Sequence, residues 1–318
     1  MDRNLALEFV RVTEGAAISC ARFVGLGDKN AADQAAVASM RKLFNDIPFS
    51  GTIVIGEGER DEAPMLFIGE KVGGGNGTKI DIAVDPLECT NSVAYGRPNA
   101  ISVLAAGPDG CLLHAPDTYM DKIAVGPKAA DAIDIHAPVE DNLKEIAGAL
   151  NKEIKDLMVV VLDRPRHEKL VKEIRSAGAR ITLIPDGDIS GAIAPSIEGS
   201  GIDVLMGIGA APEGVIAAAA LKCLGGNMQG ILKPRNEEEI ERAKKMGVRD
   251  LNKVFETDDL AKGDNLMFAA TGVTDGPMLK GINFTSFGAV SHSMVMRSKS
   301  GTVRFIESRH VFEKEPKY

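Results

Sequence analysis

Apolar residues in the first 44 positions recur at helical spacing and predict two helices, over residues 4–24 and 31–44. A glycine-bounded turn separates them, and Asn30 is the expected N-cap of the second helix. Short apolar runs then predict strands at 52–55, 66–72, 80–84, 100–104 and 111–114. The first part of the chain is therefore expected to place helices against a sheet.

From about residue 138 onward, predicted strands alternate with predicted helices. Strands are expected at 158–162, 181–184, 204–206 and 229–232, with helices at 167–177, from 189, at 213–224 and at 236–246. This alternation is typical of layered α/β proteins with some parallel strand pairing. We therefore expect an α/β fold, a layered α-β-α-β-α sandwich with mixed sheets. Its lobes would span residues 1–137 and 138–318, with tail strands after residue 266 returning to either sheet.

Composition narrows the class of protein. The 318 residues are 44% hydrophobic and 26% charged, which is typical of a globular protein, and the net charge of −8 argues against a general nucleic-acid binder. The four cysteines show no CxxC spacing, and the longest apolar runs are too short to span a membrane. With no secretory leader at the N-terminus, we expect a cytoplasmic protein that binds neither nucleic acid nor membrane.

Acidic residues follow the predicted strands. Asp85 and Glu88 stand three residues apart, where Pro86 interrupts strand pairing, so their carboxylates can converge on one hard cation. Thr90 would then offer its hydroxyl and backbone N–H to a phosphate. The alternative is an ordinary turn with Asp85 as a cap.

Three further segments repeat this arrangement. Residues 57–62 hold four acids after a strand, Lys29 and Asp33 flank a helix start, and Glu213 follows Pro212 at a strand-to-helix junction. Each has a simpler interpretation: a solvated acidic turn, acids that favour the helix dipole, and normal helix initiation, respectively. Together they favour phosphoryl transfer assisted by paired metal ions, which requires oxygen ligands and a bound water.

Charged residues that could hold a phosphorylated substrate follow two later strands. Arg164 and Arg166 flank Pro165 after one predicted strand, and arginine suits bidentate phosphate contacts. Asp186 and Asp188 follow the next strand and can accept hydrogen bonds from sugar hydroxyls. A solvated loop and an Asx turn are the alternatives.

The motif order resembles that of a known family. Gly-Asp-Lys-x-x-x-Asp from Gly27, Gly-Glu-Gly-Glu-Arg-Asp from Gly56, Asp-Pro-Leu-Glu-x-Thr from Asp85 and Gly-x-Gly-x-x-Pro-Glu-Gly from Gly207 are similar to the motifs of the class II fructose-1,6-bisphosphatases. These enzymes belong to the lithium-sensitive, inositol-monophosphatase-like phosphatase superfamily. The resemblance covers nearly the whole chain and implies a fold of the sugar-phosphatase type.

The resemblance also implies a reaction. It is the metal-dependent hydrolysis of the 1-phosphate of fructose 1,6-bisphosphate by a metal-activated water, and some relatives accept sedoheptulose 1,7-bisphosphate. Mn²⁺ or Mg²⁺ would be the cofactor, a sugar bisphosphate the small-molecule partner, and a dimer or tetramer the homo-oligomeric state.

Site residues are implied in three groups. The metal ligands would be Asp33, Glu57, Asp85, Glu88 and Glu213. The catalytic residues would be Thr90, which orients the attacking water, with Lys29 and Asp61 in support. The substrate-binding residues would be Glu88, Cys89, Thr90, Tyr119, Arg164, Pro165, Arg166, Asp186, Gly187, Asp188 and Ala210.

Two positions depart from the family pattern. Cys89 occupies a position where the signature commonly has glycine, and Ala210 replaces a glycine in the substrate-contacting loop. If the backbone at Cys89 needs a positive φ, the cysteine is strained by about 1 kcal/mol.

Two other functions remain open. The first is a phosphatase for inositol monophosphate or another sugar phosphate, which the paired arginines disfavour. The second is a nucleotide-binding α/β module, which Pro212 disfavours because it replaces the third glycine of the dinucleotide motif.

Overall fold

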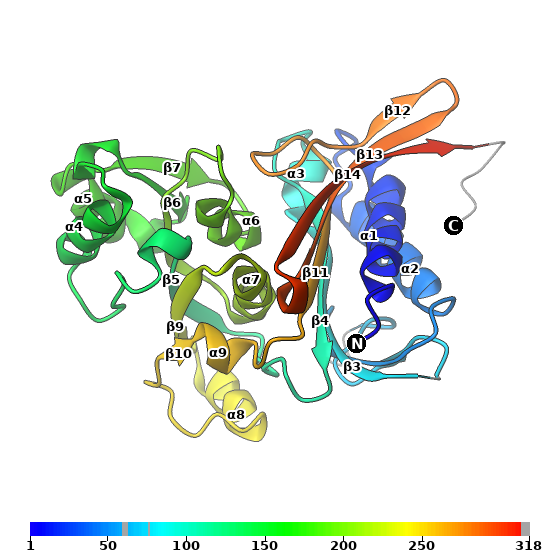
Figure 1. Ribbon diagram of the computed structural model, residues 1–318, viewed down its shortest axis with the longest axis horizontal. Helices are drawn as coiled ribbons and strands as arrows, with labels where there is room; N and C mark the ends of the chain where they lie inside the picture. Colours follow the sequence, from blue (N-terminus) through cyan, green and yellow to red (C-terminus); the bar gives the residue numbers. More distant parts are fainter. Residues whose placement is uncertain (59–62, 76, 313–318) are drawn as a thin grey trace. The chain divides into compact units, whose positions relative to one another are not determined.

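The computed structural model describes residues 1–58, 63–75 and 77–312, which form two compact units (Figure 1). The first unit combines residues 1–112 with the described part of 264–318, and the second comprises Leu113–Gly263. Each unit has its own sheet and helices.

The first unit is built on an eight-stranded mixed sheet. Its strand order is β12-β13-β11-β4-β3-β1-β2, and β14 pairs with β13. The pair β1–β3 is parallel, whereas β4 is antiparallel to both β3 and β11. The strands are β1 (Ser50–Ile55), β2 (Lys71–Val72), β3 (Lys79–Glu88), β4 (Ile101–Pro108), β11 (Met267–Gly272), β12 (Asn283–Thr285), β13 (Gly288–Arg297) and β14 (Thr302–Val311).

Two long helices, α1 (Leu5–Ala21) and α2 (Lys29–Phe44), pack on this sheet, and α3 (Thr90–Ala94) follows β3 (Figure 1). Phe49 lies edge-on to both Phe9 and Phe44, at 5.9 Å between ring centroids in each pair. All three rings are fully buried, so they anchor the helices to the sheet. The N-cap of α2 is Asp28, which accepts the N–H of Ala31, and the predicted cap Asn30 lies inside the helix.

The second unit contains a six-stranded mixed sheet in the order β10-β9-β5-β8-β6-β7. The central strand β5 is antiparallel to both β8 and β9, and β6 is parallel to both β7 and β8. The strands are β5 (Tyr119–Val125), β6 (Met158–Leu162), β7 (Arg180–Ile184), β8 (Val204–Ala210), β9 (Asn227–Lys233) and β10 (Phe255–Glu256).

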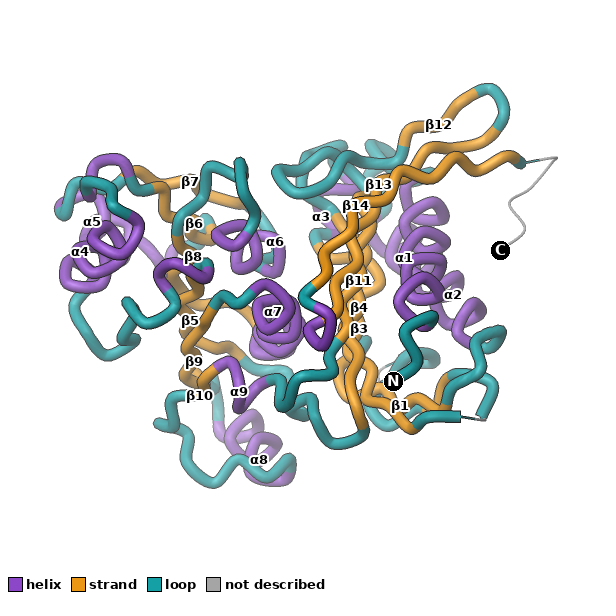
Figure 2. The backbone as a smooth tube through the Cα atoms, in the orientation of Figure 1, coloured by secondary structure: helices purple, strands orange, loops and turns teal. Residues whose placement is uncertain are grey.

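Helices cover both faces of this second sheet (Figure 2). One face packs Ile123, Val159 and Val204 against Leu143 and Ile174 of α4 and α5. On the other face α6 and α7 contact β5 and β8. The helices are α4 (Val139–Leu150), α5 (Glu168–Ser176), α6 (Ile189–Ile193), α7 (Ala211–Leu224), α8 (Glu237–Lys245) and α9 (Thr257–Leu260). Within the described residues, no helix combines the length and the apolar character needed to cross a membrane.

The predicted α/β class with mixed sheets is confirmed. The division of the chain differs from the expected lobes, 1–137 and 138–318, because residues 113–137 include β5, the centre of the second sheet. The tail strands return to the first sheet, where β11 pairs with β4. Two strand predictions were wrong in extent. The run 66–72 forms only the two-residue β2. The run 111–114 forms only an isolated bridge at Leu112, beside which Leu113 donates to the carbonyl of Leu260.

Candidate active site

Three acidic residues of the first unit, Asp33, Glu57 and Asp85, lie close enough for their charges to interact. Because β1 and β3 are parallel neighbours, with Ile55 opposite Ala83, their carboxyl ends meet at one edge of the sheet. Glu57 follows β1 after Gly56, and Asp85 and Glu88 lie among the last four residues of β3, where the pairing with β4 shifts register. Asp33 lies on α2, which packs against β3. The structure therefore brings together acids that are 52 residues apart in sequence, from Asp33 to Asp85, and Glu88 ends β3 three residues later.

These carboxylates repel one another. The pKa of Glu57 is raised to about 8, first by burial and then by the negative charges of Asp85 and Asp33. Burial also raises the pKa of Asp33, and Glu88 is only 2% exposed. A bound cation would remove this repulsion.

The donor set suits a hard divalent cation. Carboxylate oxygens are the ligands that Mg²⁺ and Mn²⁺ prefer. Among residues 1–58, 63–75 and 77–312, no three His, Cys, Asp or Glu side chains are grouped so that they could hold a metal ion together. The acids thus suit a divalent ion by their oxygen chemistry and their charge. Asp61 lies outside the described residues.

The turn after β3 places Cys89 and Thr90. Cys89 adopts the left-handed conformation with φ 70° and ψ 50°, and α3 begins at the next residue, Thr90. Cys89 is buried and Thr90 half-buried. Lys29, at the start of α2, is exposed. A glycine, which the family resemblance implies at this position, would avoid this strain, since the left-handed conformation costs a side chain about 1–2 kcal/mol.

We expect Cys89→Gly to be more stable than Cys89→Ala by about 1 kcal/mol, because alanine keeps the Cβ that strains this backbone. Urea denaturation of both variants measures the difference. The matched control is Cys223, which is also buried but lies inside α7, where alanine should be the more stable by about 1 kcal/mol. The same preference at both positions would contradict the role of the left-handed turn.

The second unit gathers its predicted site residues at one edge of its sheet. Tyr119 begins β5 and lies opposite both Ala210, at the end of β8, and Lys233, at the end of β9. The strands β6 and β7 run parallel to β8, so their carboxyl ends open at the same edge. Their loops carry the remaining predicted substrate residues, Arg164–Arg166 and Asp186–Asp188.

The two predicted arginines are held in different ways. Arg164 pairs with Asp186, at 3.1 Å between Nη2 and Oδ1, and donates to the carbonyl of Pro185. Arg166 donates from Nε at 3.0 Å and from Nη2 at 2.7 Å to the carbonyl of Ile208. Its guanidinium lies 4.6 Å from the centroid of the Tyr119 ring. The carbonyl is neutral, so Arg166 keeps its positive charge available to an anion.

Lys122 is a buried residue that the sequence prediction missed. Its Nζ lies 2.7 Å from Oδ1 and 2.6 Å from Oδ2 of Asp188, and it donates at 2.9 Å to the carbonyl of Ala210. The side chains of Lys122 and Asp188 are 1% and 3% exposed. Lys122 therefore joins two of the predicted substrate residues beneath the surface of the site.

Arg235 was also missed. It follows β9 and lies 4.6 Å from the centroid of the same Tyr119 ring. Its partner Glu239 is 4% exposed and also accepts a hydrogen bond from Thr118 at 2.6 Å. Burial alone would raise the pKa of Glu239, but the hydrogen bonds from Arg235 and Thr118 lower it to about 2. Basic residues just beyond a strand end were the available sequence signal.

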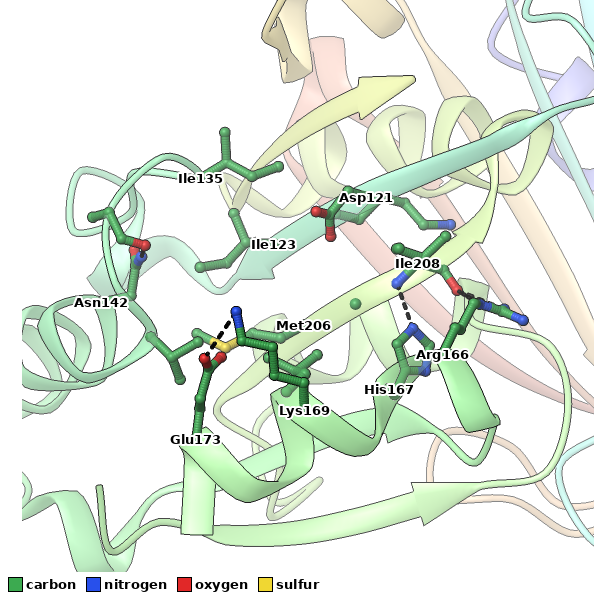
Figure 3. Close-up of a pocket in the computed structure, with 15 residues that line it drawn as sticks. Asp121, Ile123, Ile135, Asn142, Arg166, His167, Lys169, Glu173, Met206 and Ile208 are labelled. Carbon is green, nitrogen blue, oxygen red and sulfur yellow. Dashed lines mark hydrogen bonds and ion pairs between the residues drawn. The ribbon is translucent and has the colours of Figure 1, made fainter. Parts of the chain in front are cut away.

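A cavity of about 270 Å³ adjoins this edge, with Arg166 at its border (Figure 3). His167 lies beside it, accepts the N–H of Ile208 through Nε2, and contacts the carbonyl of Leu162 through Nδ1, both at 2.7 Å. Because Nε2 accepts an N–H and Nδ1 faces a carbonyl, these contacts suit the neutral ring with its proton on Nδ1, and burial lowers the pKa of His167 in the same direction. His167 thus ties β8 to the end of β6 and the segment that follows it.

Glu213 lies in the first turn of α7, whose N-cap is Ala210 and which has Pro212 near its start. It is half-buried. Its predicted role as a metal ligand stays a prediction, as do the individual roles of the other site residues.

Comparison with known proteins gives consistent matches over almost the full chain. The family model described as bacterial fructose-1,6-bisphosphatase, glpX-encoded, matches residues 3–310. A Synechococcus protein named D-fructose 1,6-bisphosphatase class 2/sedoheptulose 1,7-bisphosphatase is 49% identical, covering 98% of this chain and 96% of the relative. An Escherichia coli strain K12 protein named fructose-1,6-bisphosphatase 1 class 2 is 46% identical, covering 99% and 97%.

Proposed function

Because this chain belongs to the family of bacterial class 2 fructose-1,6-bisphosphatases, we propose that it hydrolyses the 1-phosphate of fructose 1,6-bisphosphate, giving fructose 6-phosphate and phosphate. The observation that carries the proposal beyond the family match is the crowding of carboxylates at the ends of β1 and β3, where the pKa of Glu57 rises to about 8. Such crowding is unfavourable unless a cation offsets it.

The ligands of the divalent ions, Mn²⁺ or Mg²⁺, are proposed to be carboxylates. Asp33 and Glu57 would hold one ion and Asp85 and Glu88 another, and Glu213 is retained as a further proposed ligand. When bound, such ions supply a nucleophilic water and neutralise charge on the phosphate.

Side chains next to these acids would orient the reactants. Thr90 begins α3 directly after β3, and its hydroxyl is proposed to accept a hydrogen bond from the attacking water. Lys29 and Asp61 are proposed to support this geometry, Lys29 through its positive charge beside the phosphate.

The substrate is proposed to be held by Glu88, Cys89 and Thr90 near the reacting phosphate and by residues of the second unit near the sugar and its other phosphate. The latter are Tyr119, Arg164, Pro165, Arg166, Asp186, Gly187, Asp188 and Ala210. What supports this assignment is that the strand pairing of the second unit brings these residues to one edge of its sheet.

A second substrate, sedoheptulose 1,7-bisphosphate, is proposed because the name of the Synechococcus relative includes that activity. A cytoplasmic location and a homo-oligomeric state, dimer or tetramer, complete the proposal.

The test is release of phosphate from fructose 1,6-bisphosphate with added Mn²⁺ or Mg²⁺, followed by removal of the metal with a chelator. We expect turnover that the chelator abolishes, that returned metal restores, and that far exceeds turnover on inositol monophosphate. Absence of turnover with both metals, or equal turnover on the two substrates, would refute the proposal.

A further inference from the structure

Arg235 lies beside the proposed substrate residues, but the proposed function gives it no role. The strand pairing of Lys233 with Tyr119 brings the segment after β9 to the edge where the predicted substrate residues gather. Arg235, two residues further, lies over the Tyr119 ring at 4.6 Å from its centroid, the same distance as Arg166. Two guanidinium groups therefore meet at one aromatic ring.

Each arginine is fixed by its own anchor. Arg166 is held by the carbonyl of Ile208. Arg235 is held by Glu239, with Nε and Nη2 both 2.5 Å from Oε1, while the backbone N–H of Arg235 donates to Oε2 at 2.8 Å. Both guanidiniums are thus oriented before any ligand arrives, which lowers the entropy cost of binding.

The local charge is positive. Arg166, Arg235 and Lys233 are exposed at this edge, whereas Glu239 is the buried partner of Arg235. The Arg235 side chain remains 48% exposed despite that pairing. Anchoring uses two of the nitrogens of each guanidinium, and arginine carries five N–H donors in all. The remaining donors suit the oxygens of a phosphate.

We propose that Arg235 is a specificity-determining residue, which together with Arg166 and Tyr119 binds the phosphate that stays on the sugar. This inference rests on the proposed function, because it assigns part of the same substrate. It predicts that Arg235 raises kcat/KM for a sugar bisphosphate but not for a sugar monophosphate that carries only the phosphate to be removed.

The experiment compares Arg235→Met on two substrates, fructose 1,6-bisphosphate and fructose 1-phosphate. We expect kcat/KM for the bisphosphate to fall about 30–100-fold, mainly through KM, since a charge-assisted contact to phosphate is lost. For fructose 1-phosphate, kcat/KM should stay within about twofold, because no second phosphate is present. Arg235→Lys should recover part of the loss, since it keeps the charge but not the planar fork.

Two further variants separate binding from folding. Arg242→Met is the matched control, because Arg242 lies on the adjacent helix α8 and pairs with Glu238 at 3.6 Å, and it should change neither substrate. Arg235→Met leaves the buried Glu239 without its guanidinium, so the double variant Arg235→Met/Glu239→Gln is assayed as well. It should show the same selective loss on the bisphosphate.

The outcomes distinguish this inference from the proposed function. If the wild-type chain fails to hydrolyse fructose 1,6-bisphosphate with metal, the proposed function itself fails. If the wild-type chain is active, an equal loss on both substrates, no loss, or recovery of bisphosphate activity in the double variant would overturn the role of Arg235.

Discussion

Glu57→Gln should lower kcat/KM for fructose 1,6-bisphosphate by roughly 10³-fold or more, since even changes outside the direct metal ligands cost 10–100-fold. Glutamine keeps the shape of the side chain and, above the Glu57 pKa of about 8, removes a negative charge that repels Asp85 and Asp33. The free energy of unfolding without metal should therefore be unchanged or higher. Steady-state kinetics and urea denaturation measure the two effects.

Metal binding supplies a second readout for the same variant. Added Mn²⁺ should raise the melting temperature of the wild-type protein, because a ligand that binds only the folded state stabilises it. Glu57→Gln should lose most of this rise. The control is Asp46→Asn, an exposed carboxylate of the same unit, which should keep both activity and the metal-dependent rise. Full activity of Glu57→Gln at saturating Mn²⁺ would refute the assignment of Glu57 as a ligand.

Lys122→Met should lower the free energy of unfolding by about 3–5 kcal/mol, because it leaves the buried carboxylate of Asp188 without its cation. Methionine has a similar volume, so the loss would come from charge rather than from packing. Urea denaturation measures it. The pair Lys152–Asp203 is the control: Lys152 is 40% exposed, so Lys152→Met should cost only about 1 kcal/mol.

The double variant Lys122→Met/Asp188→Asn tests the cause. It should recover a large part of the lost stability, because the unpaired charge is gone. Purely additive losses would mean that Lys122 acts through packing alone. Since Nζ also holds the carbonyl of Ala210, the single variant should in addition weaken substrate binding.

The acidic part of the site could be predicted from sequence because its residues stand at strand ends. Asp85 and Glu88 flank Pro86 at the end of one apolar run, and Glu57 follows another after Gly56. The sequence predicted strain at Cys89 if its φ were positive, and its φ is 70°. In these segments the order of apolar and polar residues along the chain is enough to predict where a strand ends and a turn begins.

The missed elements depend on contacts between distant residues. The strand β5 was not predicted because Asp121 and Lys122 interrupt its apolar pattern, although it is central to the second sheet. The charge of Lys122 is tolerated there only because Asp188 lies 66 positions away in sequence. Arg235 likewise comes close to Tyr119 only because Lys233 pairs with Tyr119 across the sheet, and the sequence around Arg235 does not predict that pairing.

The two glycines of β8 show how such contacts constrain a strand. A Cβ at Gly209 would lie 1.9 Å from Oδ2 of Asp188, and one at Gly207, where φ is +123°, would lie 2.9 Å from Nε2 of His167. Glycine is therefore needed at both positions, because the side chains of Asp188 and His167 occupy the space that a Cβ would take. Across diverging relatives, substitutions here should be rejected as strongly as at ligand-binding positions. The Gly-x-Gly spacing would then be retained in evolution because the interior beside β8 has no room for a side chain, and it would need no bound nucleotide to explain it.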